Sequence, residues 1–153
     1  MKKLYFVVAI FSCLLFFSCG KEETITPEKI LAGDGEKRWK LIEFTVDPPY
    51  QGFVNILAAK HDCEDDDFYV FYENGDYEVN QSNVRCPGST SNIGDEGIWK
   101  VGEFAATIDF YSDNNGKTTY GLEYFREDRM TMHRNTVEDG VRYAVHKVYV
   151  PYD

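Results

Sequence analysis

The fold is decided by residues 66–79, which read DDFYVFYENGDYEV. Phe68 to Tyr72 and Tyr77 to Val79 are rich in aromatic and β-branched residues, which favour strands. Between them, Glu73-Asn74-Gly75 supplies residues that tolerate the positive φ of a tight hairpin loop. The stretch therefore predicts a β-hairpin and indicates an all-β fold.

Two registers are open to this hairpin, and they place opposite faces of its strands inward, because side chains alternate across a strand. A two-residue Asn74-Gly75 loop would pair Tyr72 with Tyr77. A three-residue loop with a glycine bulge would instead pair Phe71 with Tyr77. Both faces carry apolar residues, so the pattern alone leaves both registers open.

The composition is that of one domain. The chain has 153 residues, which is enough for a substantial core. It carries 26 acidic and 16 basic residues, an excess of negative charge that argues against nucleic-acid binding. Its 11 tyrosines, 11 phenylalanines and 2 tryptophans suit an all-β domain, whose pleated surfaces pack wide, flat side chains.

The first residues form an export signal rather than part of the fold. Lys2 and Lys3 precede an apolar run from Leu4 to Phe17 and the small residue Ser18, which is the pattern of a secretory signal peptide. The run is shorter than the roughly 20 residues that span a bilayer, so a transmembrane helix is the weaker interpretation. We expect a signal peptide over residues 1–18, cut before Cys19, a tether over 19–29 and a folded domain over 30–153.

The junction from Phe16 to Gly20 resembles the lipobox of bacterial lipoproteins. That resemblance implies that Cys19 is lipidated and becomes the mature amino terminus. The following Lys21-Glu22-Glu23 resembles the signal that sends many lipoproteins of Bacteroidota to the outer face of the outer membrane, and a polar tether is the plainer alternative. We therefore expect an outer-membrane lipoprotein at the cell surface, which contacts the membrane only through its lipid anchor.

Local signals predict one short helix followed by eight strands. Thr26 suits an N-cap, Pro27 the first helical position and Gly33 the stop, and Ile30 and Leu31 would plug one end of the domain. The alternating runs are residues 38–46, 68–72, 76–81, 97–102, 105–111, 118–125, 129–134 and 141–150, with turns at 112–116 and 135–140. Eight antiparallel strands favour a closed up-and-down barrel, because closure removes exposed edges; a two-sheet sandwich is the alternative.

Alternation also predicts which side chains share a face of a strand. One set is Ala106, Ile108 and Phe110, a second is Tyr120, Leu122 and Tyr124, and a third is Met130 with Met132. Thr107, Asp109, Thr131 and His133 fall on the opposite face.

Several of these motifs together resemble the lipocalin-like lipoproteins of Bacteroidota. They are Lys37-Arg38-Trp39-Lys40-Leu41, Cys63, Asp66-Asp67, Tyr69, Phe71, Asn74-Gly75, Tyr77, Cys86 and Gly97-Ile98-Trp99. The resemblance extends over about residues 30–150 and implies a small lipocalin-like barrel with a helix or lid across one end. The family it points to is described as binding small apolar molecules or has no known ligand. It also implies the three-residue hairpin loop, with Tyr69, Phe71, Tyr77 and Val79 pointing inward.

Cys63 and Cys86 are expected to form a disulfide around the hairpin. Once the signal is removed they are the only thiols besides Cys19, and an exported protein meets an oxidising compartment. Such a cross-link would stabilise the domain by about 3 kcal/mol. A catalytic cysteine is the alternative, but no histidine lies in a motif with either residue.

Two polar stretches could offer oxygen ligands to a metal ion. Residues 61–67 are rich in aspartate, but they lack the spacing of a calcium loop, and a solvated acidic loop is the simpler interpretation. Asp113-Asn114-Asn115-Gly116 has the composition of a turn. We predict no metal site and no cofactor.

The candidate ligand-binding residues are large side chains on predicted strands and in one loop segment. They are Trp39, Phe53, Ile56, Tyr69, Phe71, Tyr77, Trp99, Tyr120, Tyr124, Met130 and Met132. An eight-stranded barrel has room for packed side chains or for one small ligand, so each residue either lines a cavity or fills the core. Phe53 and Ile56 belong to residues 53–59, which form either a short helix that acts as a lid or a short edge strand.

The function class that fits these features best is a module that binds a small apolar or amphipathic molecule. A surface module for proteins or glycans, with a filled barrel, is the alternative, and it would use outer aromatic residues such as Phe68, Tyr72 and Tyr111. An enzyme fits least, because the three histidines lie in no catalytic motif and the chain has no nucleophile elbow and no phosphate-binding loop. The sequence leaves the oligomeric state open.

Overall fold

One antiparallel sheet curls round until its first long strand pairs with its last. The computed structural model describes residues 25–59, 67–81, 91 and 93–153. Its elements are helix α2 (Pro27–Ala32), strands β1 (Glu36–Tyr50) and β2 (Phe53–Asn55), 3₁₀ helix η2 (Ile56–Ala59), strands β3 (Phe68–Tyr72), β4 (Asp76–Asn80) and β5 (Ile93–Val101), 3₁₀ helix η4 (Glu103–Ala105), and strands β6 (Thr107–Ser112), β7 (Gly116–Arg126), β8 (Arg129–Glu138) and β9 (Val141–Pro151).

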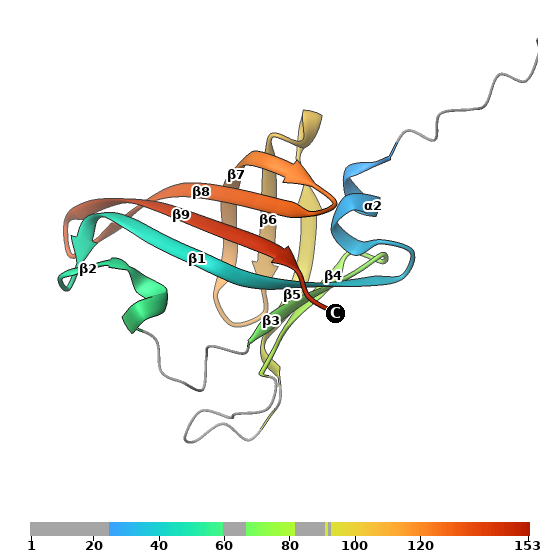
Figure 1. The fold of residues 1–153 in the computed structure, drawn as a ribbon, viewed down its shortest axis with the longest axis horizontal. Helices are drawn as coiled ribbons and strands as arrows, with labels where there is room; N and C mark the ends of the chain where they lie inside the picture. Colours follow the sequence, from blue (N-terminus) through green and yellow to red (C-terminus); the bar gives the residue numbers. More distant parts are fainter. Residues whose placement is uncertain (1–24, 60–66, 82–90, 92) are drawn as a thin grey trace, which may run out of the picture.

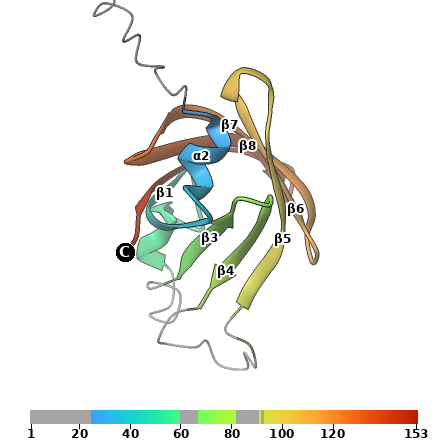
Figure 2. The ribbon, with the colours of Figure 1, turned by 90° about the vertical axis from the view of Figure 1, so that its right-hand side faces the viewer.

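Strand β1 closes the barrel, because it is long enough to pair with two neighbours. Its first part pairs with β3, from Glu36 to Lys40, and a later part pairs with β9, from Trp39 to Asp47. The other strands follow one another in sequence order between them, as Figures 1 and 2 show, and β2 adds to the far part of β1. The predicted eight-stranded up-and-down barrel is therefore confirmed.

The β3–β4 hairpin adopts the three-residue loop. Phe71 pairs with Tyr77 and Tyr69 with Val79, and Gly75 has a φ of 92°, which is the left-handed conformation that the glycine bulge requires. Phe71 and Tyr77 are buried, as the resemblance implied. Phe68, on the opposite face of β3, is buried as well, because the ring of Tyr152 lies 5.2 Å from it.

A bulge in β7 changes which of its side chains point inward. Leu122 pairs with Met132, but the next pair is Tyr124 with Thr131, so the register shifts at Glu123. Tyr124 is consequently exposed and Phe125 is buried. The prediction that Tyr124 shares the inner face with Tyr120 and Leu122 is therefore wrong, because strict alternation ends at the bulge.

The β8–β9 hairpin is longer and tighter than predicted. Strand β8 continues to Glu138, which pairs with Val141, so only Asp139 and Gly140 remain in the turn. Both have positive φ, 49° and 78°, the combination found in two-residue hairpin turns. The expected turn over residues 135–140 is thus a strand followed by a two-residue turn.

Helix α2 closes one end of the barrel, as Figure 2 shows. The hydroxyl of Thr26 accepts a hydrogen bond from the Lys29 amide at 3.3 Å, and Gly33 ends the helix, so the predicted caps are confirmed. Leu31 is fully buried in the core, as expected of a plug. Helix α2 begins at Pro27, inside the predicted tether.

The segment proposed as a lid, residues 53–59, is a strand in its first part and a helical turn in its second. Phe53–Asn55 forms an edge strand against β1, and Ile56–Ala59 forms a single 3₁₀ turn. The side chain of Asn55 starts this turn by accepting a hydrogen bond from the Leu57 amide at 3.0 Å.

Several predictions fall on residues outside the described ranges. These are the signal peptide, Cys19, the pair Cys63 and Cys86, and the acidic residues 61–66. Within the described ranges, no helix has the length and apolar character needed to cross a membrane.

Candidate functional site

Part of the barrel interior is completely filled by large side chains. Trp39, Phe71, Trp99 and Met130 are buried there, and the rings of Phe71 and Trp99 meet edge to face at 6.0 Å. Both indole nitrogens are satisfied, since Trp39 donates to the Leu31 carbonyl at 2.8 Å and Trp99 donates to the Asp76 carbonyl at 2.9 Å. These four candidate residues belong to the packed core, and Trp99 also lines an open hollow at the surface.

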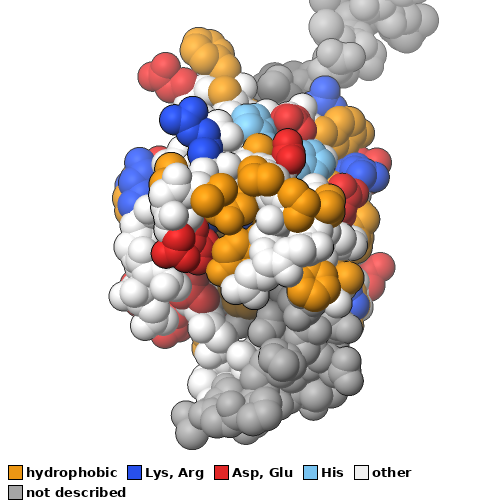
Figure 3. Space-filling model, turned by 90° about the vertical axis from the view of Figure 1, so that its left-hand side faces the viewer, with side chains coloured by type: hydrophobic (Ala, Val, Ile, Leu, Met, Phe, Trp, Pro, Cys, Tyr) orange, Lys and Arg blue, Asp and Glu red, His pale blue; other side chains and the backbone are white. Residues whose placement is uncertain are grey.

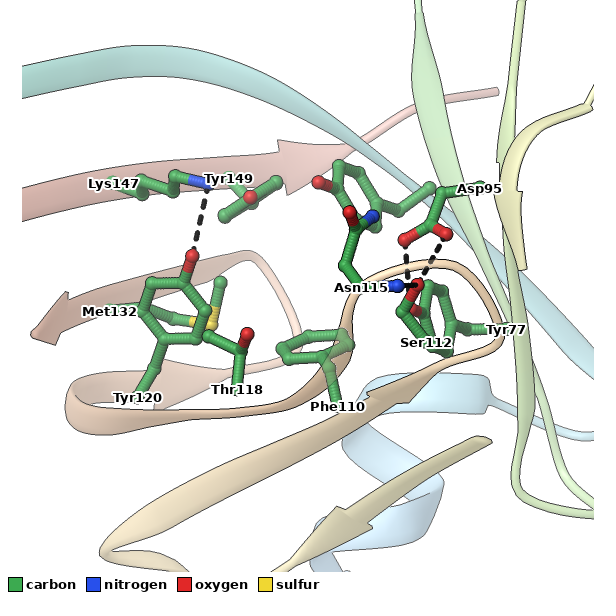
Figure 4. Close-up of a pocket in the computed structure, with 11 residues that line it drawn as sticks. Tyr77, Asp95, Phe110, Ser112, Asn115, Thr118, Tyr120, Met132, Lys147 and Tyr149 are labelled. Carbon is green, nitrogen blue, oxygen red and sulfur yellow. Dashed lines mark hydrogen bonds between the residues drawn. The ribbon is translucent and has the colours of Figure 1, made fainter. Parts of the chain in front are cut away.

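A cavity of about 120 Å³ remains beside this packed region (Figure 4). It begins at Phe110, whose ring packs 5.9 Å from that of Phe71. Four candidate residues line it: Tyr69, Tyr77, Tyr120 and Met132. Seven further residues complete the wall, namely Asp95, Phe110, Ser112, Asn115, Thr118, Lys147 and Tyr149.

One side of the cavity is a hydrogen-bonded network around Asp95. The hydroxyl of Tyr77 donates to one carboxylate oxygen at 3.0 Å, and the hydroxyl of Ser112 donates to the other at 2.6 Å. Ser112 in turn accepts from the amides of Asn114 and Asn115, so residues 112–116 form the predicted turn. Burial and the hydrogen bond to Asp95 raise the pKa of Tyr77, which keeps its hydroxyl protonated as a donor.

On another side, Lys147 projects from β9 into the interior (Figure 4). Its ammonium donates to the Tyr120 hydroxyl at 3.3 Å and lies 4.8 Å from the ring centroid of Phe44. Burial lowers the pKa of Lys147, whereas Tyr69 and Tyr120 raise it, and the net shift is upward. This charge effect requires a phenolate, whereas a neutral phenol offers the ammonium only a hydrogen bond. Beside neutral phenols the ammonium therefore retains most of the cost of its burial.

A second hollow, of about 90 Å³, adjoins the first at Tyr69 and Lys147, which line both. Leu57 of η2 covers part of it, so one residue of the proposed lid segment does contribute to the mouth. Phe53 and Ile56 line neither hollow, and Phe53 is 45% exposed. Tyr124 is also outside, because of the bulge in β7.

The residues that sequence reasoning missed carry most of the polarity of the site. Lys147 and Tyr149 pair directly with Met132 and Met130, so they belong to the same inner face. Alternation along residues 141–150 could have indicated this, with an inward lysine as the unusual feature. Asp95 and Asn115 gave no such signal, because Asp95 falls outside the predicted strands and Asn115 lies in a turn.

A surface module for proteins or glycans would need exposed aromatic side chains on the outer face of the barrel, and two of those proposed for it are not freely exposed. Phe68 packs against Tyr152, and the ring centroid of Tyr111 lies 5.6 Å from the ammonium of Lys100 and 5.3 Å from that of Lys117. Exposed apolar side chains gather instead at the end of the molecule that Figure 3 shows. They include Phe53, Val54, Val137 and Val141, from β2 and the β8–β9 hairpin.

Comparison with known proteins gives no family assignment. A scan against models of protein families finds no match to this chain, and a search of curated proteins finds no similar sequence. In the described part of the chain, no three histidine, cysteine or acidic side chains stand together in a way that could hold a metal ion. The fold is compatible with a lipocalin-like barrel.

Proposed function

We propose that this protein is a lipocalin-like lipoprotein of the cell envelope that binds a small amphipathic molecule inside its barrel. The observation that carries this proposal is the cavity of about 120 Å³, whose wall combines aromatic rings with hydroxyls and one ammonium group. Ligand pockets are mostly apolar, with a few placed polar groups that fix the ligand's orientation. The wall of this cavity combines both kinds of group, including the carboxylate of Asp95, although its surface is slightly more polar than apolar.

The volume of the cavity limits the size of the ligand. A dry cavity of about 150 Å³ in another protein holds one benzene molecule. The present cavity is somewhat smaller, so a single ring or a short chain would be held only if side chains of the wall moved slightly. The second hollow lies directly behind Tyr69 and Lys147, so movement of these two side chains would join the hollows and admit a longer molecule.

The cellular location rests on the sequence around Cys19. The lipobox-like junction supports lipid attachment at that residue, and Lys21-Glu22-Glu23 supports display at the cell surface. Incorporation of a labelled fatty acid into the native protein, and its loss in Cys19→Ala, would test lipidation. Protease treatment of intact cells would test exposure, and cleavage only after lysis would contradict it.

A surface module for proteins or glycans has less support. Of the outer aromatic residues expected to serve it, Phe68 is buried and Tyr111 is covered by lysines. The exposed apolar residues on β2 and the β8–β9 hairpin are three valines and one phenylalanine, so they offer a protein or glycan a single aromatic ring.

Native mass spectrometry tests the proposed function. The chain from Gly20 onward should be purified from its host without detergent, alongside Thr118→Phe and Thr119→Phe. Thr118 lines the cavity, whereas the neighbouring Thr119 is exposed, so the same ring is added inside or outside the barrel. A reproducible added mass is expected for the native protein and for Thr119→Phe but not for Thr118→Phe. A bare polypeptide mass in all three, with no uptake from a metabolite extract, would contradict ligand binding.

A further inference from the structure

Two cationic side chains on neighbouring strands converge on one tyrosine in the barrel. Lys147 of β9 lies with its ammonium 5.3 Å from the ring centroid of Tyr120, and the guanidinium of Arg134, on β8, lies 5.1 Å from the same centroid. Both contacts are favourable cation–π interactions. The two cations nevertheless repel each other, since the charge of Arg134 lowers the pKa of Lys147.

Neither cation has an acidic partner among the described residues. Among the residues that the structure describes, no carboxylate lies within ion-pair distance of Lys147 or Arg134, whereas Arg38 and Lys117 each have an acidic partner. This is unusual in a chain with a net charge of −10, where acidic partners are plentiful.

The hydrogen-bonding capacity of these groups is also incompletely used. An ammonium group has three donors, and in the described ranges Lys147 has one hydrogen-bond partner, the Tyr120 hydroxyl. The Nε atom of Arg134 is buried and has no hydrogen-bond partner in the same ranges. Burying a charge without a counter-charge is costly, so an anion bound at this place would remove a cost that the empty barrel carries.

We propose that the molecule bound in the barrel is a small carboxylic acid, whose carboxylate lies against Lys147 beside Tyr120. This inference rests on the proposed function and narrows its ligand class. Arg134 contributes positive potential from behind the Tyr120 ring. The apolar part of the acid lies between Phe110 and Met132, which line the remainder of the cavity.

The opposite wall supports this orientation of the acid. Asp95 lies across the cavity from Lys147 in Figure 4, and its carboxylate repels an anion from that side. Both oxygens of Asp95 already accept hydrogen bonds, from Tyr77 and Ser112. A cationic group on the ligand would therefore gain less at Asp95 than a carboxylate gains at Lys147, where donors are unused.

Calorimetric titration of the native protein with benzoate and with benzamide tests the inference, because the two probes have nearly the same shape and differ in charge. Benzoate should bind at least about tenfold more tightly, as expected of a charge-assisted hydrogen bond. This preference should disappear in Lys147→Met, which keeps the length of the side chain, and should decrease in Arg134→Gln. The matched control is Lys100→Met, which removes the same charge from the outer face and should keep the preference. Octanoate serves as an aliphatic probe, and the same preference over octanamide would support the carboxylate site with a fatty-acid source.

The outcomes separate this inference from the function on which it rests. Equal binding of benzoate and benzamide, or a preference that survives both Lys147→Met and Arg134→Gln, would overturn the carboxylate site while leaving a ligand-binding barrel. A neutral or cationic host molecule found by native mass spectrometry would overturn it in the same way. Failure of every probe together with a bare native mass would overturn both proposals.

Discussion

The indole of Trp39 donates a hydrogen bond of 2.8 Å to the backbone carbonyl of Leu31, and both residues are fully buried. This contact fastens helix α2 to the barrel at its closed end. Trp39→Phe leaves that carbonyl without its donor and removes buried ring volume. We expect a loss of about 2–4 kcal/mol in the free energy of unfolding, measured by chemical denaturation. Tyr124→Phe, at an exposed position, is the control, and equal stabilities of the two variants would contradict this role of Trp39.

Met130 and Met132 allow a matched comparison of the filled and the hollow parts of the interior. Both are buried on the inner face of β8, but only Met132 lines the cavity. Met130→Ala should cost about 2–5 kcal/mol of unfolding free energy, because it opens a void among packed rings. Met132→Ala should cost less, because fewer packing contacts are lost beside an existing hollow, and it should alter ligand affinity. A larger loss for Met132→Ala would show that the cavity wall is packed as tightly as the core.

The sequence was sufficient for the strand order and for most of the core, because alternation and turn residues are local signals. Helix α2 and the barrel followed from such signals. The position of Tyr124 did not, because the bulge at Glu123 is set by the register between β7 and β8. The role of Lys147 was also missed, because an inward lysine is recognised only when closure of the barrel surrounds it with Tyr69, Tyr120 and Tyr149.

Lys147→Met should stabilise the ligand-free protein at neutral pH. The substitution replaces a partly buried charge that has no acidic partner in the described part of the chain with an apolar side chain of similar length. Replacing a buried ion pair by apolar side chains is neutral or stabilising by about 1–4 kcal/mol, and a charge with no acidic partner lacks even the attraction of such a pair. Thermal and chemical denaturation of the ligand-free protein would measure the change. A clear loss of stability would mean that the ammonium contributes to folding in the absence of a ligand.

The buried tyrosines predict a loss of stability at alkaline pH. Burial raises the pKa of Tyr77, with a further contribution from Asp95, and burial raises the pKa of Tyr149 as well. A raised folded-state pKa means that the native state holds these protons more tightly than the unfolded state. Their contribution is complete below the unfolded value of about 10 and is lost as the pH rises above it.

Denaturation between about pH 8 and pH 12 checks this dependence. Tyr77→Phe should flatten the alkaline decline in stability, since it removes one of the two groups. Tyr124→Phe should leave the decline as it is in the native protein. An unchanged slope in Tyr77→Phe would indicate that Tyr77 titrates equally in the folded and unfolded states.

The central claim is that a small molecule occupies the cavity beside Met132, and methionine-methyl NMR tests it most directly. The methyl groups of Met130 and Met132 lie on the same strand, but only Met132 faces the cavity. On titration with benzoate, or with a molecule recovered from the native protein, the methyl resonance of Met132 should shift in a saturable way. The resonance of Met130 should change little. A ligand that binds without moving the Met132 resonance would place its site outside the barrel and contradict the account.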